Sequence, residues 1–265
     1  MTRALKNLRV LAEYIGLYAG LLLLGTMLLA ATALCLVMIV LTPRHKRRRT
    51  GRWFASATFR AYLRLLQMAG LLRADLHELD ELAADRSLVI VPNHPCLLDA
   101  LLVISRLPNV ACIMKADLWD NPFLGAGARM AGYIRNDSAR CMVRQAVEDL
   151  RTDGHLLVFP EGTRTLRKPV NPLKGACALI AKRARVPLQV VIIETDSPFL
   201  SKGWPLWRKP AFPLHYRVRL GQRIEPRGSV EELMAQLAQN YERELSARRA
   251  AAPVYSRSND TPIDA

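Results

Sequence analysis

Residues 1–42 carry the longest apolar stretch of the chain. No charged residue occurs from Tyr14 to Thr42, and Leu, Ala, Ile, Val and Met dominate the run from Ile15 to Leu41. At about 1.5 Å of rise per residue, this run is longer than a hydrocarbon core of about 30 Å requires. A signal peptide has a shorter apolar stretch and a cleavage site of small residues, whereas this run continues into the basic residues 43–49. The pattern predicts a retained membrane anchor at 1–42, either a tilted spanning helix or a shallow re-entrant hairpin.

The next segment, 43–72, has the pattern of an amphipathic helix. Apolar positions recur at spacings of three and four while polar positions fall on another arc. The apolar set is Phe54, Ala57, Ala61, Leu65, Met68 and Leu72, and the polar set is Arg52, Ser56, Arg60, Arg64 and Gln67. The segment is predicted either to lie along a membrane surface, with the preceding basic cluster on anionic head groups, or to pack on the following domain. Each face could serve one of these roles.

Residues 73–246 alternate between short apolar runs and helical patterns. Strands are predicted at residues 88–91, 110–114, 155–159, 188–193 and 216–220. Helices are predicted at 99–106, from a cap at Ser138 to about residue 153, at 175–185, and from a capping box at Ser229–Glu232 onward. This alternation indicates an α/β fold with a mixed β-sheet covered by helices, preceded by the N-terminal membrane helix. Residues 247–265 are predicted to be a flexible tail.

Composition narrows the class of partner. The chain has 265 residues and a formal charge of +15, which indicates a polyanion such as nucleic acid, an anionic membrane or a phosphorylated substrate. Two thirds of the excess lies in residues 1–75, next to the apolar run, and no nucleic-acid motif occurs, so a bilayer is favoured over nucleic acid. The cations that follow the run place the bulk of the protein on the cytoplasmic face of the inner membrane. Five scattered cysteines fit small core residues in a reducing compartment.

A polar turn follows the strand predicted at 88–91. His94 lies in this turn, and Asp99, five residues later, falls in the first turn of the next helix. A carboxylate so placed can fix the imidazole tautomer and leave the other ring nitrogen as a general base. The absence of a G-x-S-x-G motif implies that the base acts on a substrate hydroxyl. The alternative is that His94 caps a turn and Asp99 caps a helix.

A second polar turn follows the strand predicted at 155–159. Gly162 permits a close backbone approach, Thr163 offers a hydroxyl, and Arg164 offers a planar fork suited to phosphate. Glu161 could orient that arginine or a substrate hydroxyl. The alternative is an ordinary strand-to-helix turn with a solvated ion pair. A later segment, 199–209, combines two tryptophans with three cations and suits either a membrane boundary or local packing.

These two turns resemble the first and third motif blocks of the lysophospholipid acyltransferase family, which includes the 1-acyl-sn-glycerol-3-phosphate acyltransferases. The matching sequences are NHPCLLD at 93–99 and FPEGTRT at 159–165. Lys174-Gly175-Ala176 and Val186-Pro187-Leu188 resemble the fourth block. The likeness covers roughly residues 73–220.

The resemblance implies transfer of a fatty acyl group from acyl-CoA or acyl carrier protein to the hydroxyl of a lysophosphatidic acid-like acceptor, with no cofactor and no metal. His94 would be the general base and Asp99 would orient it. The substrate-binding residues implied are Asn93, Lys115, Arg135, Glu161, Gly162, Thr163, Arg164, Lys174 and Pro187. Membrane lipids, the lysophospholipid acceptor and the acyl donor are the implied partners.

The second block departs from the family pattern. Where the family has isoleucine, aspartate and arginine, this chain has Gly132-Tyr133-Ile134-Arg135-Asn136-Asp137, with Arg140 beyond it. The departure leaves the acceptor open, so the same fold could acylate a lyso-ornithine lipid or a lipid of a specialised pathway. A non-catalytic membrane lipid-binding protein is the remaining alternative.

Overall fold

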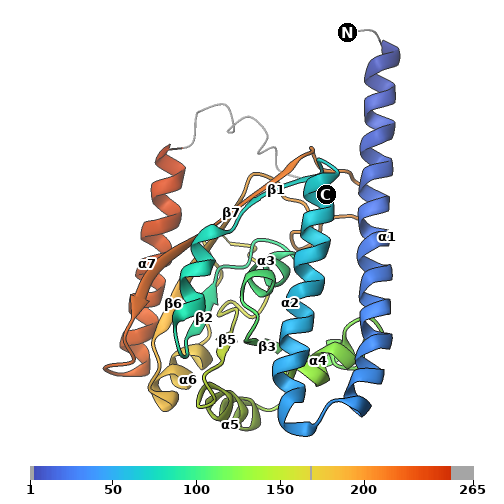
Figure 1. The fold of residues 1–265 in the computed structure, drawn as a ribbon. Helices are drawn as coiled ribbons and strands as arrows, with labels where there is room; N and C mark the ends of the chain where they lie inside the picture. Colours follow the sequence, from blue (N-terminus) through green and yellow to red (C-terminus); the bar gives the residue numbers. More distant parts are fainter. Residues whose placement is uncertain (1–2, 168, 252–265) are drawn as a thin grey trace.

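A seven-stranded sheet forms the centre of the computed structural model, which describes residues 3–167 and 169–251 (Figure 1). The strand order is β1-β7-β6-β2-β5-β3-β4, with β6 and β7 antiparallel and the other neighbours parallel. The strands are β1 Leu72–Asp75, β2 Val89–Pro92, β3 Val110–Met114, β4 Ile134–Arg135, β5 His155–Leu157, β6 Leu188–Thr195 and β7 Leu214–Ile224. The predicted mixed sheet is confirmed.

Helices cover both faces of the sheet. The helices are α1 Arg3–Leu41, α2 Arg44–Met68, α3 Asp99–Arg106, α4 Gly125–Ala131, α5 Ala139–Leu150, α6 Ala176–Ala184 and α7 Val230–Ala251, with 3-10 segments η1 His77–Ala84 and η2 Ala116–Leu118. Ile90 of β2 packs with α2, η1 and α3, whereas its neighbours Val89 and Val91 pack with α5, α6 and α7. Because both faces are buried, the central strands are continuous apolar runs and not alternating ones.

The predicted strands and helices are present, with ends that differ by a few residues. The structure also contains elements that the pattern did not predict, namely β1, β4, α4 and the two 3-10 segments. β4 has two residues, and β1 alternates Leu72, Arg73, Ala74 and Asp75 over only four. Neither is long enough to show a periodicity. Both lie at the sheet edges, where the neighbouring strand determines their conformation.

The buried face of α2 differs from the predicted one. Arg52, Ser56, Phe59, Leu63 and Leu66 face the domain, while Leu65 and Met68 of the expected apolar face point outward. The reason is that two polar members of this face find partners inside. Ser56 donates to the carbonyl of Ser105 at 3.2 Å, and Arg52 forms an ion pair with buried Asp149 at 2.5 Å. Of the two roles predicted for 43–72, packing on the domain is present, through the opposite arc.

Arg52 joins three elements. Its Nε donates to the carbonyl of Ala131 at the end of α4, and its Nη2 reaches Asp149 on α5. The preceding residue is Gly51. A Cβ at this position would lie 2.6 Å from the backbone of Met130 and Ala131, so any larger residue would clash with α4. A glycine followed by a buried arginine therefore lets α2 approach α4 closely.

The long helix α1 lies beside α2 and α4 (Figure 1). Tyr62 of α2 donates to the carbonyl of Gly20 at 3.3 Å, Thr32 donates to the carbonyl of Phe123 at 2.9 Å, and Cys35 packs against Ala126. Most other side chains of α1 are exposed. Residues 7–41 are long and apolar enough to cross a membrane, by length and composition.

The last helix begins with the predicted capping box. Ser229 N–H donates to Glu232 Oε2 at 2.9 Å, and Glu232 N–H donates to Ser229 Oγ at 3.1 Å. α7 continues to Ala251, so the first residues of the segment predicted to be flexible, 247–265, are helical. The rest of that segment lies outside the described residues.

Candidate active site

The turn after β2 is fixed to the next strand by Asn93. Its amide nitrogen donates to the carbonyl of Ile193 at 3.0 Å, and its amide oxygen accepts from the N–H of Ile193 at 2.7 Å. Both ends of this buried amide therefore bind β6. Asn93 thus holds the turn that carries His94 to the sheet, and its predicted contact with substrate stays a prediction.

His94 and Asp99 are brought together as predicted. Nδ1 of His94 lies 2.7 Å from Asp99 Oδ2, and the N–H of Cys96 donates to the same oxygen at 2.8 Å. Since that oxygen accepts from a backbone N–H, we assign the proton to Nδ1 of His94, which leaves Nε2 as the basic nitrogen. The imidazole also stacks on Phe159, with ring centroids 4.0 Å apart. The hydrogen bond to Asp99 and the stacking on Phe159 together fix the orientation of the His94 ring.

Asp99 is the first residue of α3 and is 0% exposed. Burial raises the pKa of its carboxyl, while hydrogen bonds from His94 and Cys96 act in the opposite direction. His94 itself remains partly exposed, with 16% of its side chain accessible. A buried acceptor behind a solvent-accessible imidazole is an arrangement that allows general-base chemistry.

Glu161 ties the second polar turn to the first. Its Oε1 accepts from the backbone N–H of His94 at 2.9 Å and from the Thr165 hydroxyl at 2.8 Å, and its Oε2 accepts from the N–H of Asn171 at 2.8 Å. The N–H of Thr165 in turn donates to the carbonyl of His94 at 2.7 Å. Both carboxylate oxygens of Glu161 therefore accept hydrogen bonds within the protein. Of the two roles considered for Glu161, orienting Arg164 is not observed among the described residues, and orienting a substrate hydroxyl stays a prediction.

Two cations border the turn at Gly162. This glycine has φ +67°, and a Cβ there would lie 2.7 Å from Lys174 Nζ. Arg164 uses Nη1 to donate to the carbonyls of Leu200 and Ser201, at 2.8 and 3.0 Å. Lys174, which only the fourth-block resemblance indicated, thus lies beside Gly162. Thr163, between Gly162 and Arg164, is half-buried.

Two other predicted binding residues lie at the same end of the strands as His94, but on strands farther from β2. Lys115 follows β3, and Arg135 ends β4 with its Nε 3.0 Å from Asp137 Oδ2. In the sheet, β3 is two strands from β2 and β4 is three strands from β2, at roughly 4.8 Å per strand. Pro187 does not belong to this group. The carbonyl of Pro187 accepts from the N–H of Val89 at the start of β2, so Pro187 lies at the opposite end of the strands from His94.

Sequence reasoning missed several residues that support the site. Phe159 and Asn171 were not singled out, and Cys96 was interpreted only as a small core residue. Cys96 is buried and contacts Asp99, whereas Cys141 is exposed and is not a core residue at all. The one sequence signal for Cys96 was its position inside the 93–99 motif. In the described part of the chain, His, Cys, Asp and Glu side chains do not gather in a group of three that could hold a metal ion.

The segment that carries both polar turns is similar to a known family. Residues 73–194, which contain both polar turns, match the family model described as Acyltransferase. The match shows that this segment is similar to that family. The matched segment runs from β1 to β6 and includes the His94–Asp99 pair and the turn at Gly162.

Proteins that are similar to this chain are named for different lipid acceptors. The chain is 31% identical over 121 residues to a putative 1-acyl-sn-glycerol-3-phosphate acyltransferase of Caenorhabditis elegans, covering 43% of each chain. It is 38% identical over 89 residues to the lyso-ornithine lipid O-acyltransferase of Rhodobacter capsulatus, covering 32% of each. The chain thus spans less than half the length of these relatives.

The fold extends beyond the matched domain. The crystal structure of the 1-acyl-sn-glycerophosphate (LPA) acyltransferase PlsC from Thermotoga maritima superposes with a TM-score of 0.71 at 20% identity, covering 92% of this chain and 98% of that one. The likeness includes regions outside residues 73–194, and at this identity it shows a shared fold.

Proposed function

We propose that this protein transfers a fatty acyl group from a thioester donor to the hydroxyl of a lysophospholipid at a membrane surface. The observation that carries the proposal is the 2.7 Å contact between His94 and buried Asp99 inside the segment that is similar to the Acyltransferase family. Among the described residues, the imidazole of His94 is hydrogen-bonded to Asp99 through Nδ1, and the neighbouring Cys96 thiol contacts Asp99 and not the free nitrogen, which suits direct attack by a substrate hydroxyl.

The proposed reaction proceeds in two proton transfers at Nε2 of His94. First, Nε2 takes the proton of the acceptor hydroxyl as its oxygen forms a bond to the thioester carbonyl carbon, and Asp99 stabilises the resulting imidazolium. The tetrahedral intermediate then collapses, the carbon–sulfur bond breaks, and the leaving thiolate takes the proton from Nε2. The products are an ester and a free thiol, and His94 regains its starting state.

The turn at Gly162 is the proposed phosphate site. Arg164 contacts the carbonyls of Leu200 and Ser201 through Nη1, and a guanidinium has five N–H donors, so its other N–H groups can bind a phosphate. Lys174 adds a second cation beside the glycine, whose missing Cβ leaves the turn open. Lys115 and Arg135 are the candidates for a more distant part of the head group.

A second acceptor class is favoured by one observation. The relative that is 38% identical acts on lyso-ornithine lipid, whose amino-acid head group carries no phosphate. In that case Arg164 and Lys174 would face the acceptor's carboxylate or the donor. The hydroxyl chemistry at His94 is the same for both acceptors.

Membrane attachment is proposed to occur along α1, in the plane of the interface. Contacts from Glu13, which pairs with Lys209, to Cys35, which packs against Ala126, join one face of α1 to the domain over roughly 33 Å at 1.5 Å per residue. A perpendicular spanning helix would carry the polar domain into the hydrocarbon, which is costly. The apolar face that points outward is therefore proposed to enter one leaflet, with the basic residues 44–49 at its head groups.

The segment 199–209 is proposed to link this membrane face to the active site. Its first part accepts hydrogen bonds from Leu97 and Arg164 through Leu200, and its last part pairs with α1 through Lys209. Trp204 is packed locally against Phe199, whereas Trp207 is 75% exposed. An acceptor lipid would thus meet His94 without leaving the membrane surface.

A substrate panel tests the proposal. The purified protein is incubated in mixed vesicles with acyl-CoA or acyl carrier protein thioester and, in turn, lysophosphatidic acid, other lysophospholipids and lyso-ornithine lipid, followed by lipid extraction and mass spectrometry. A diacylated phospholipid product is expected. Product with lyso-ornithine lipid alone would select the second acceptor class, and no acylated product with any combination would contradict an enzymatic function.

A further inference from the structure

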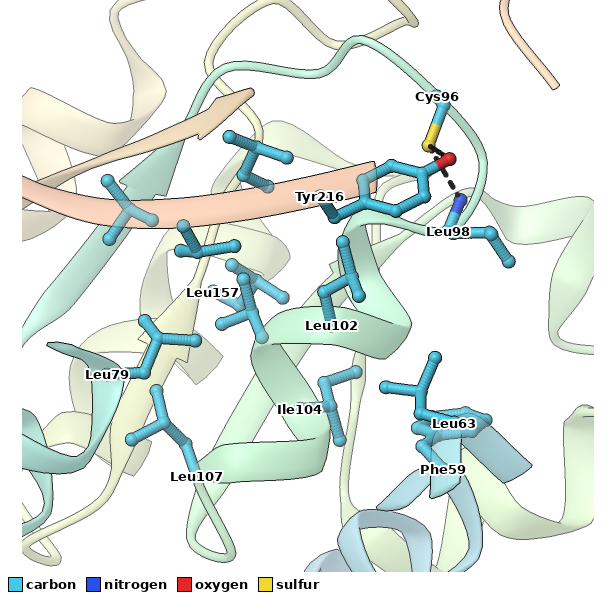
Figure 2. Close-up of a cluster of buried hydrophobic side chains, with 14 of the residues drawn as sticks. Phe59, Leu63, Leu79, Cys96, Leu98, Leu102, Ile104, Leu107, Leu157 and Tyr216 are labelled. Carbon is cyan, nitrogen blue, oxygen red and sulfur yellow. Dashed lines mark hydrogen bonds between the residues drawn. The ribbon is translucent and has the colours of Figure 1, made fainter. Parts of the chain in front are cut away.

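Polar groups continue behind the His94–Asp99 pair into the interior. Asp99 Oδ2 is used by His94 and the Cys96 N–H, while its Oδ1 lies 3.0 Å from the Cys96 sulfur. On its other side the sulfur lies 3.4 Å from the Tyr216 hydroxyl of β7 and accepts from the N–H of Leu98 at 3.3 Å. Figure 2 shows the sulfur of Cys96 directed at both of these groups, at the end of the buried cluster. The sulfur is thus the link between β7 and Asp99.

The direction of each hydrogen bond follows from the protonation states. Burial raises the pKa of the Cys96 thiol well above its usual value, and burial also raises the pKa of the Tyr216 hydroxyl. Both groups therefore keep their protons at neutral pH. An ionised Asp99 can only accept, so the thiol donates to Oδ1, and the sulfur accepts from Tyr216 and Leu98. Tyr216 in turn has a hydrogen bond with Thr195 of β6.

We propose that Cys96, held by Tyr216, is a positioning residue that fixes Asp99 so that its second oxygen faces His94. This inference rests on the proposed function, in which His94 is the base. A carboxylate held at one oxygen can still turn about its Cβ–Cγ bond, whereas donors at both oxygens define its plane. Tyr216 anchors the sulfur to the sheet, which places the turn after β2 and the strand β7 in one hydrogen-bonded unit.

The proposed unit has a measurable effect on proton affinity. A donor to a carboxylate stabilises its charged form and lowers the pH at which the coupled His94–Asp99 pair takes up a proton. The titratable groups around Asp99 are His94 and Cys96 from its own turn and Tyr216 from β7, with Glu161 reaching only the backbone of His94. Removing the thiol therefore raises the pH of proton uptake by the pair.

The test is the pH dependence of acyl transfer by Cys96→Ala, Cys96→Ser and Tyr216→Phe. For Cys96→Ala we expect the acidic limb of kcat/KM to move up by about half to one pH unit, because one of three donors to Asp99 is lost. We expect kcat to fall about 5- to 20-fold with KM for the thioester little changed, since the loss acts on the base and not on binding. Cys96→Ser restores a donor and should return the limb toward that of the parent.

A matched control is available in the same buried cluster. Cys112 on β3 is also a buried thiol, but its sulfur donates to the carbonyl of its neighbour Ile113 at 3.4 Å and is not part of the network at Asp99. Cys112→Ala removes the same atoms and should leave the pH profile unchanged. Tyr216→Phe should shift the acidic limb in the same direction as Cys96→Ala but by less, because it acts through the sulfur.

Two outcomes separate the inference from the function on which it rests. If His94→Ala abolishes turnover while Cys96→Ala and Tyr216→Phe both titrate as the parent does, the positioning role is wrong and the proposed function stands. If His94→Ala keeps the parental rate, the proposed base is wrong. Thermal unfolding shows which variants are folded, and Tyr216→Phe, which leaves the turn after β2 intact, carries the test if Cys96→Ala does not fold.

Discussion

At the scale of single residues, burial decides which polar groups are available for chemistry. Asn93 and Glu161 carry polar side chains within the motifs, yet their hydrogen bonds go to the backbone of this chain. His94 is the one member of its pair that remains accessible, because Asp99 lies beneath it at the start of α3. The motif spacing was sufficient to predict the His94–Asp99 contact, since five residues cross from the strand end to the first helical turn.

The roles of Asn93 and Glu161 could not be predicted in the same way. The partners of Asn93 lie on β6 and those of Glu161 include Asn171, so both depend on contacts that are distant in sequence. Spacing within one motif carries no information about such partners. For the same reason Lys174 was known only from the resemblance, and its position beside Gly162 came from the fold.

Asp99→Asn tests the electrostatic cost of the pair. Because burial raises the pKa of Asp99 in the folded protein, its contribution to stability is present at low pH and is lost as pH rises through the folded pKa. We expect the unfolding temperature of Asp99→Asn, relative to the parent, to be higher at pH 8 than at pH 4. Turnover should fall by about 10²- to 10⁴-fold, because the amide no longer holds the correct tautomer.

Calorimetry at the two pH values checks this expectation, with Asp120→Asn, an exposed carboxyl, as the control that should show little difference. A variant that loses as much stability at pH 8 as at pH 4 would show that Asp99 is not destabilised by its burial.

At the scale of elements, α2 shows why periodicity can select the wrong face. Its outward arc contains Leu65 and Met68, and its inward arc contains Arg52 and Ser56, so a simple apolar count favours the outward arc. The inward polar residues are tolerated because Asp149 and the carbonyl of Ser105 satisfy them. An apolar outward arc on a helix that already packs through its other side is consistent with contact to lipid.

The Arg52–Asp149 pair is expected to be essential to the packing of α2. Removing Arg52 leaves the buried Asp149 with only the longer contact to the exposed Arg48 at 3.7 Å, which costs up to about 3–5 kcal/mol of the free energy of unfolding. We therefore expect Arg52→Met to lower the denaturant midpoint strongly, as measured by circular dichroism in detergent. Arg64→Met, on the exposed side of the same helix, is the control and should change little. Equal midpoints for the two variants would mean that the pair does not hold α2.

At the scale of the whole molecule, the sheet topology brings the two motif turns together. β2 and β5 are parallel neighbours, so the turns that follow them meet at one edge, as open α/β sheets with parallel strands arrange their ligand sites. The predicted alternation of strands and helices indicated one sheet for both turns, whereas the pairing of β2 with β5 came from the structure. The path of α1 along the domain could not be predicted, because the apolar run specifies length and hydrophobicity but not what the helix packs against.

The outward face of α1 should govern membrane binding. We expect the combined change Leu22→Gln, Leu29→Gln and Leu36→Gln, all at exposed positions, to weaken co-sedimentation with anionic vesicles by tenfold or more, since each buried leucine contributes about 1.5–3 kcal/mol. Leu166→Gln, an exposed leucine that lies off α1, is the control. Unchanged sedimentation of the triple variant would contradict attachment through this face.

The account as a whole depends on His94 acting as the base for a thioester-dependent acyl transfer. The most direct measurement is the rate of thiol release from the acyl donor, together with the acylated lipid formed, for the parent and His94→Ala at equal concentrations in the same vesicles. The account predicts that His94→Ala loses both signals while its unfolding temperature and vesicle binding match those of the parent. A His94→Ala variant that still acylates the acceptor at a rate close to the parental one would contradict it.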